Sequence, residues 1–230
     1  MSLEAPPAPG PTRPGWARPL IAVLAAVGLL LFGAAAGLLI RLPGSAASSV
    51  PTADSVDVGF AHDMSVHHQQ AVQMASWERD HTTDPALKQL AFDIETTQLQ
   101  QIGRMQGWLG LWGAAADPPG GKHMAWMASS PDTHAHDAMT SGGVDAMPGM
   151  ATSDQLRALR AASGEQMDVL FLQLMLRHHE GGVIMLQYGS EHASVPEVRN
   201  LAAQMLSAQT SESEYLKQLL AARGGTPLPL

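Results

Sequence analysis

The chain contains an internal repeat, and this repeat restricts the folds that it can adopt. Residues in the region 60–109 recur 111 positions later without a gap. The most distinctive shared stretch is Met-x-x-His-His, found at residues 64–68 and again at residues 175–179. The positions of the first copy that fall on an identical residue are Phe60, Met64, His67, His68, Val72, Met74, His81, Pro85, Leu90, Ala91, Gln98 and Leu109. The sequence therefore predicts two matching structural units.

Each copy has the pattern of a helical hairpin. In the first copy a helix should begin at Asp54 or Ser55, both good N-caps, and Asp84 followed by Pro85 should open a second helix that extends to about Trp112. The second copy repeats this arrangement. A single hairpin cannot bury its own apolar stripe, so we expect the two hairpins to pack together as an all-α, ferritin-like four-helix bundle with pseudo-two-fold symmetry.

The expected boundaries follow from breaks in the helical pattern. Residues 113–152 show no persistent period and are rich in Gly, Pro, His and Met, so we assign them to the connection between the hairpins. A soft cation such as Cu(I) suits their histidine and methionine side chains, although a biased but unstructured linker explains the same composition. The predicted segments are 1–19 (disordered tail), 20–40 (membrane anchor), 41–54 (linker), 55–223 (bundle, comprising 55–112, 113–152 and 153–223) and 224–230 (tail).

The N-terminal region predicts the compartment. Residues 20–40 carry no charge and, at 1.5 Å per residue, are long enough to cross the ~30 Å hydrocarbon core of a bilayer. Arginines precede this run and Arg41 follows it, after which no Lys or Arg occurs before Arg79, which places the N-terminus in the cytoplasm. The alternative is a signal peptide cleaved near residues 45–47. Both interpretations place the bundle outside the cytoplasm, either membrane-anchored or secreted.

Composition excludes several classes of function. The formal net charge of -8 argues against nucleic acid as a partner, because phosphate binding requires clusters of Lys and Arg. The absence of cysteine excludes disulfides, thiolate metal sites and cysteine catalysis. Methionine is then the only soft ligand available, and the chain has 13 methionines beside 10 histidines.

The helical wheel places a set of metal-ligand types on the faces that should be buried. His67 and His178 lie on these faces, with methionines three residues before and seven residues after each of them, and the second histidine of each pair is turned about 100° away. A glutamine interrupts the apolar stripe of each following helix and could fix the imidazole tautomer. The candidate metal ligands are His67, His178, Met64, Met175, His68, His179, Met74, Met185 and Asp63, supported by Gln98 and Gln209. In the competing interpretation these are core histidines hydrogen-bonded to the same glutamines, and the methionines are core filler.

The stretches 63–71 and 171–181 resemble the two signature sequences of the domain-of-unknown-function 305 family, and the resemblance extends over residues 55–223. It implies a ferritin-like four-helix fold, and some members of that family are exported proteins associated with copper and silver binding and resistance. The chain departs from the expected pattern at Gln101, which occupies the position equivalent to Glu212.

These observations lead to a functional hypothesis with two alternatives. The hypothesis is an extracytoplasmic protein that binds, buffers or delivers copper, with Cu(I) favoured, and performs no catalysis. The first alternative is a metal-dependent redox enzyme at the same histidines, with Asp63 and Glu78 as acid or base, and the second is an interaction module with structural histidines. A di-iron carboxylate site is disfavoured, because only Glu78 and His81 match its Glu-x-x-His pattern and Gly189 replaces Glu78 in the second copy.

Overall fold

A computed structural model of the chain describes residues 17–39, 50–116, 121–129 and 142–230. The chain divides into two compact units, Met1–Ser49 and Val50–Leu230. Within the described residues the regular structure is helical, apart from one antiparallel bridge between His123 and Val144. This confirms the predicted all-α class.

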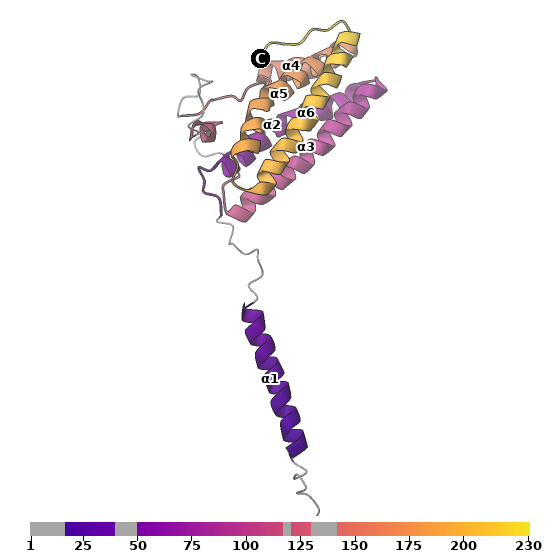
Figure 1. Cartoon of the computed structure of the whole chain (residues 1–230). Helices are drawn as coiled ribbons and strands as arrows, with labels where there is room; N and C mark the ends of the chain where they lie inside the picture. The colour runs from indigo at the N-terminus through magenta and orange to yellow at the C-terminus, as the bar shows by residue number, and fades with distance from the viewer. Residues whose placement is uncertain (1–16, 40–49, 117–120, 130–141) are drawn as a thin grey trace, which may run out of the picture. The chain divides into compact units, whose positions relative to one another are not determined.

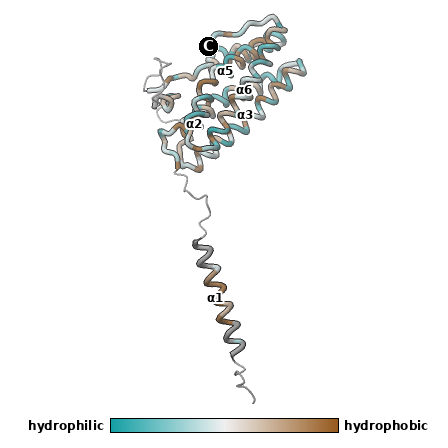
Figure 2. Tube along the Cα trace, viewed as in Figure 1, coloured by the Kyte–Doolittle hydropathy of each residue, from teal (hydrophilic) through white to brown (hydrophobic). Residues whose placement is uncertain are grey.

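The first unit contains a single described helix, α1 (Ala17–Leu39). The coloured part of α1 in Figure 2 is hydrophobic, and its large apolar side chains from Val23 to Phe32 are exposed. Among the residues that the structure describes, no helix is both long and apolar enough to span a membrane. The membrane anchor expected at residues 20–40 therefore stays a prediction.

The second unit consists of two helical hairpins (Figure 1). The first hairpin is α2 (Val56–His81) and α3 (Pro85–Trp112), and the second is α5 (Glu165–His192) and α6 (Pro196–Ala222). α2 packs against α3 and α5, and α5 packs against α6. A short helix, α4 (Ser153–Ala161), precedes α5, and a 3-10 turn (Ala125–Ser129) lies in the connection between the hairpins. The predicted pair of hairpins is thus present.

The helix starts show why the sequence folds in this way. The Ser55 side chain accepts a hydrogen bond from the Val58 amide, and the Asp84 side chain accepts from the first amides of α3, so both predicted N-caps are confirmed. α6 lacks such a cap of its own. The buried Asp57 carboxylate of α2 instead accepts the amides of Ser194 and Val195, at 3.0 and 2.8 Å, and ties the two hairpins together.

The bundle core has two apolar clusters. One surrounds Phe60, Met64, Met105, Met185 and Met205, and the other surrounds Met74, Ile94, Phe171, Met175 and Leu216. Neither cluster includes the central turns of the four long helices. The buried side chains found there are polar, and we call them the histidine layer: His67, His68, Gln98, His178, His179 and Gln209. The repeat therefore places its shared polar residues at one level of the bundle.

Candidate metal site: a layer of buried histidines

The centre of the histidine layer is a pair of imidazoles from the two copies of the repeat. His67 of α2 and His178 of α5 have ring centroids 3.7 Å apart, with an interplanar angle of 33°. Both side chains have no exposed surface. The prediction that these two histidines meet in the interior of the bundle is confirmed.

Each ring of the central pair has an oxygen acceptor at Nε2. His178 Nε2 lies 3.0 Å from the His67 carbonyl oxygen, and His67 Nε2 lies 3.4 Å from the carbonyl oxygen of Pro148 in the connection between the hairpins. A carbonyl oxygen can only accept, so Nε2 of each ring carries the proton. The lone pair of each ring then resides on Nδ1.

The outer histidines of the two pairs, His68 and His179, also have an oxygen acceptor at Nε2. His68 Nε2 lies 2.8 Å from Gln101 Oε1, and His179 Nε2 lies 2.8 Å from Glu212 Oε2. His68 and His179 are as fully buried as the central pair. The wheel placed them on a flank, and the structure shows that this flank faces α3 in one copy and α6 in the other. The Gln101-for-Glu212 difference keeps the acceptor and removes its charge.

All four Nδ1 atoms are buried and have no hydrogen-bond partner among the described residues. Burial lowers the pKa of His67 to about 3 and that of His68 to about 4, because a charged ring would lose its hydration there. Burial also lowers the pKa of His178 well below its usual value, and the neighbouring His67 lowers it further. His67, His68 and His178 are therefore neutral near pH 7, and these three rings present unprotonated Nδ1 lone pairs.

The two glutamines are buried as the sequence predicts, but they do not make the predicted hydrogen bonds. Neither polar atom of the Gln98 amide has a partner among the described residues, and Gln209 Oε1 also has none. Gly182 explains how Gln209 reaches the layer, since a Cβ there would lie 3.4 Å from Gln209 Oε1 and 3.2 Å from His67 Cε1. Two backbone carbonyls and the side chains of Gln101 and Glu212 accept the Nε2 hydrogen bonds and fix the tautomers. Gln98 and Gln209 do not take this role.

The four candidate methionines are fully buried and lie in the two apolar clusters. Met64 and Met185 belong to one cluster, and Met74 and Met175 belong to the other. The repeat thus supplies a thioether from each copy to each cluster. Among the residues that the structure describes, no three His, Asp or Glu side chains are arranged to hold one metal ion.

Asp63 is engaged elsewhere. Its Oδ1 accepts from His123 Nδ1 at 2.7 Å, and its Oδ2 accepts from the Met124 amide and from Trp126 Nε1, both at 2.6 Å. The Trp126 ring also covers Gly59, where any Cβ would collide with it. Asp63 therefore anchors the connection between the hairpins to α2, and its oxygens point to this anchor.

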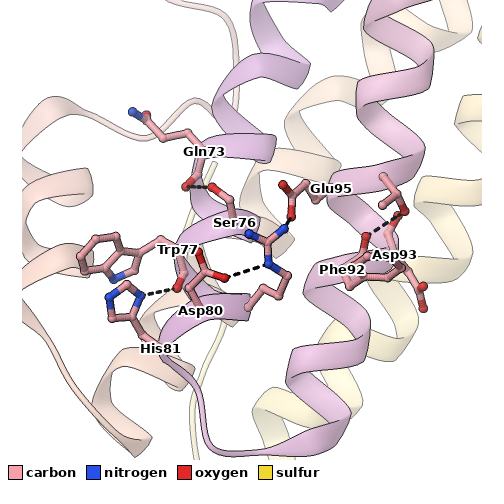
Figure 3. Close-up of polar contacts among 10 residues, drawn as sticks. Gln73, Ser76, Trp77, Asp80, His81, Phe92, Asp93 and Glu95 are labelled. Carbon is pink, nitrogen blue, oxygen red and sulfur yellow. Dashed lines mark hydrogen bonds and ion pairs between the residues drawn. The ribbon is translucent and has the colours of Figure 1, made fainter.

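Glu78 and His81 do not form a joint site. Glu78 is fully buried, and burial together with the neighbouring Asp168 carboxyl raises its pKa to about 8. His81 is exposed, and its Nδ1 lies 2.8 Å from the Trp77 carbonyl oxygen (Figure 3). An open pocket near this turn is lined by Arg79, Asp80, Lys88, Gln89 and Phe92. None of the predicted ligands lines it.

Sequence reasoning missed the segment that covers the histidine layer, residues 147–151, which we call the strap. The Gln70 side chain holds the strap through the backbone of Ala151: its Oε1 accepts from the Ala151 amide at 2.6 Å, and its Nε2 donates to the Ala151 carbonyl at 2.9 Å. Gly149, at φ 79°, and Gly181 let the strap backbone lie directly on α5. The available signal was Pro148-Gly149 between two methionines inside a long connection. Among the histidines and methionines of residues 113–152, to which the sequence assigns a possible role in binding a soft cation, His134, His136 and Met139 lie outside the described residues.

The described part of the second unit is thus a helical domain whose interior holds a layer of histidines supplied by both copies of the repeat. Residues 57–220 match the family described as domain of unknown function 305 (DUF305), and the chain belongs to that family. The chain matches none of the curated proteins with which it was compared.

Several solved structures share the fold. A DUF305 protein from Streptomyces coelicolor, described as secreted, is 40% identical, with a TM-score of 0.68 over 78% of this chain and 100% of its own. A DUF305 fragment from Deinococcus radiodurans is 29% identical, with a TM-score of 0.56 over 73% and 96%. The protein CopM in its Cu(I)-bound form is 25% identical, with a TM-score of 0.53 over 72% and 96%.

Proposed function

We propose that the domain is a copper-binding protein that holds Cu(I) as cargo at the histidine layer and serves in storage, buffering or delivery. The observation that carries this proposal is the set of four buried Nδ1 atoms without partners. A buried polar atom normally has a partner, so four equivalent exceptions at one level indicate a missing ligand. Each Nε2 already donates to an oxygen, an arrangement typical of histidines that bind metal through the other nitrogen.

The available donors favour a soft monovalent cation. Neutral imidazole and thioether bind Cu(I) well, whereas hard divalent cations prefer carboxylates. The one carboxylate among the predicted ligands, Asp63, already accepts three hydrogen bonds. Low coordination by imidazole and thioether also suits Cu(I). The Cu(I)-bound form of CopM adds support from a relative with the same fold.

Within the layer, His67 and His178 would supply the central nitrogens, and His68 and His179 the outer ones. Met64 and Met185 on one side, and Met74 and Met175 on the other, are the thioethers available to complete the coordination. The ion supplies a centre that accepts lone pairs. The chain supplies four buried Nδ1 atoms in a dry interior, and oxygen acceptors at Nε2 hold the rings in place.

The test is a competition titration against a chromophoric Cu(I) chelator. The His67→Ala/His178→Ala variant should lose at least one high-affinity equivalent of Cu(I). The matched control is His81→Ala/His192→Ala, which removes another repeat-related pair whose members are exposed. Equal affinity of the parent and the His67/His178 variant would refute the site. Circular dichroism on each variant confirms that the fold persists.

We further propose that the domain works outside the cytoplasm, tethered through residues 20–40. The S. coelicolor relative described as secreted supports the compartment. The uncharged run and the positions of the flanking arginines support the tether.

A further inference from the structure

The buried histidine layer requires a route by which a cation can reach it. All four imidazoles have no exposed surface, so an ion in solvent cannot contact them unless part of the domain moves. Four long helices supply the layer and three of its four Nε2 acceptors. Among the described residues, the strap is the non-helical segment with a polar contact to the layer, through the Pro148 carbonyl and His67 Nε2.

The strap is attached in a way that permits local opening. Its polar attachments are the two hydrogen bonds between Gln70 and Ala151 and a longer one, 3.3 Å, from Arg177 to the Met150 carbonyl. Pro148 is exposed, and its contact to His67 is long. Segments held by few and partly exposed hydrogen bonds open at a lower free energy than the packed helices beneath them.

The strap also carries soft ligands at the required place. Met147 is buried and Met150 is half-buried, and they flank Pro148, whose carbonyl oxygen touches the layer. Both methionines pack into the cluster that contains Met64 and Met185. The two strap methionines thus share an apolar cluster with Met64 and Met185, the thioethers three residues before His67 and seven residues after His178.

We propose that the strap is the gate of the histidine layer and that Met147 and Met150 are transfer ligands for a soft monovalent cation, Cu(I) or Ag(I). The inference rests on the proposed function of the layer. Because loosening the strap leaves the four imidazoles in the chain and disturbs only the long Pro148–His67 contact, it speeds both uptake and release of the ion, with a much smaller change in the dissociation constant.

The first experiment loosens the strap from two sides. In Gly181→Ala the new Cβ would lie 2.4 Å from the Pro148 backbone, which forces the strap off α5, and Gln70→Ala removes both hydrogen bonds to Ala151. Gly107→Ala is the matched control, since a Cβ there meets nothing within 4 Å. The observable is the rate of Cu(I) transfer from a chromophoric chelator, with affinity measured separately.

Both loosened variants should exchange Cu(I) about tenfold faster or more, because weakening the closed state by one or two hydrogen bonds raises the open population by that order. Gly107→Ala should match the parent. If Gln70→Ala and Gly181→Ala bind Cu(I) and exchange it at the parental rate, the strap is not the gate. If the parent binds no Cu(I) in the equilibrium titration, the proposed function fails and the gate fails with it.

The second experiment tests the transfer ligands. Met147→Leu/Met150→Leu keeps apolar volume and removes both thioethers, and Met167→Leu is the control in the other apolar cluster. The double variant should take up Cu(I) and Ag(I) several-fold more slowly while keeping the parental affinity. Uptake at the parental rate would overturn the role of the two methionines, whatever the strap variants show.

Discussion

Glu78 is a carboxyl group in an environment that disfavours its charge. Its side chain is fully buried. Burial raises its pKa to about 8, and the adjacent Asp168 carboxyl adds to the rise. In the unfolded chain the same group titrates near 4.5. Between these values the folded state holds a proton that the unfolded state has lost, so stability falls as pH rises through this window.

Glu78→Gln should remove this pH dependence. The variant is expected to match the parent near pH 4.5 and to become progressively more stable than the parent up to pH 8, by at most about 1.4 kcal/mol per pH unit. Urea unfolding across this range measures the difference. Glu214→Gln, at an exposed position, serves as the control and should follow the parent. Parallel curves for Glu78→Gln and the parent would show that Glu78 is ionised in the folded state.

The sequence indicates Glu78 as a possible acid or base, but it does not identify the partner of this side chain. Asp168 lies 111 positions after Asp57, so the repeat marks both residues, yet they act differently. Asp57 accepts two amides of the α5–α6 turn, whereas Asp168 lies beside Glu78. A periodic pattern reports which face is buried. The partner across an interface depends on the packed geometry, which the pattern does not contain.

At the scale of elements, the helices were predictable and the connection was not. The bounds of α2 and α3 follow from Ser55, Asp84 and Pro85, because caps and proline act through the local backbone. Residues 113–152 show no hydrophobic periodicity. Their described parts are positioned by contacts with residues far away in the sequence, such as Asp63 with Trp126 and Gln70 with Ala151. Sequence alone predicted Asp63 as a metal ligand, since its loop partners carry no pattern.

Asp63→Ala should detach the segment that contains His123, Met124 and Trp126. The substitution removes the acceptor of three hydrogen bonds and leaves buried donors unpaired, which should lower the free energy of unfolding by about 2–4 kcal/mol. Trypsin should also cut faster after Lys122, within that segment. Asp93→Ala, at an exposed position of α3, is the control. An unchanged cleavage rate at Lys122 would mean that other contacts hold the segment.

At the scale of the whole molecule, the repeat determines where buried polar residues lie in the core. The hairpins place two apolar clusters around one polar level, and the central rings come from equivalent positions of the two copies. The pairing of His67 with His178 was predictable because pseudo-two-fold symmetry brings equivalent positions together. The orientation of the rings was not, because it depends on Pro148 and on the backbone of α2.

The proposed tether makes a prediction for the full chain. Residues 20–40 should keep the protein in the membrane fraction after alkaline carbonate washing, and replacing Leu30 and Leu31 with Asp should release it, since charge at the centre of a span is strongly unfavourable. Fractionation of cells that produce each form measures this. A matched pair of substitutions in the predicted linker, Ser48→Asp/Ser49→Asp, is the control. Release of the parent as a shortened protein would instead support signal cleavage.

The hydrogen bonds at the four Nε2 atoms have a further consequence for the exchange of protons. Thiolate sites and exposed histidine sites must give up protons before they can hold a metal, so their affinity rises and falls with the acidity of the medium. In the histidine layer, burial lowers the pKa of His67 to about 3 and that of His68 to about 4, and it also lowers the pKa of His178, so the Nδ1 atoms of these three rings carry no proton near neutral pH. Binding at these three rings would release no protons there. The affinity of such a site for its ion would therefore stay nearly constant when the pH of its surroundings changes around neutrality.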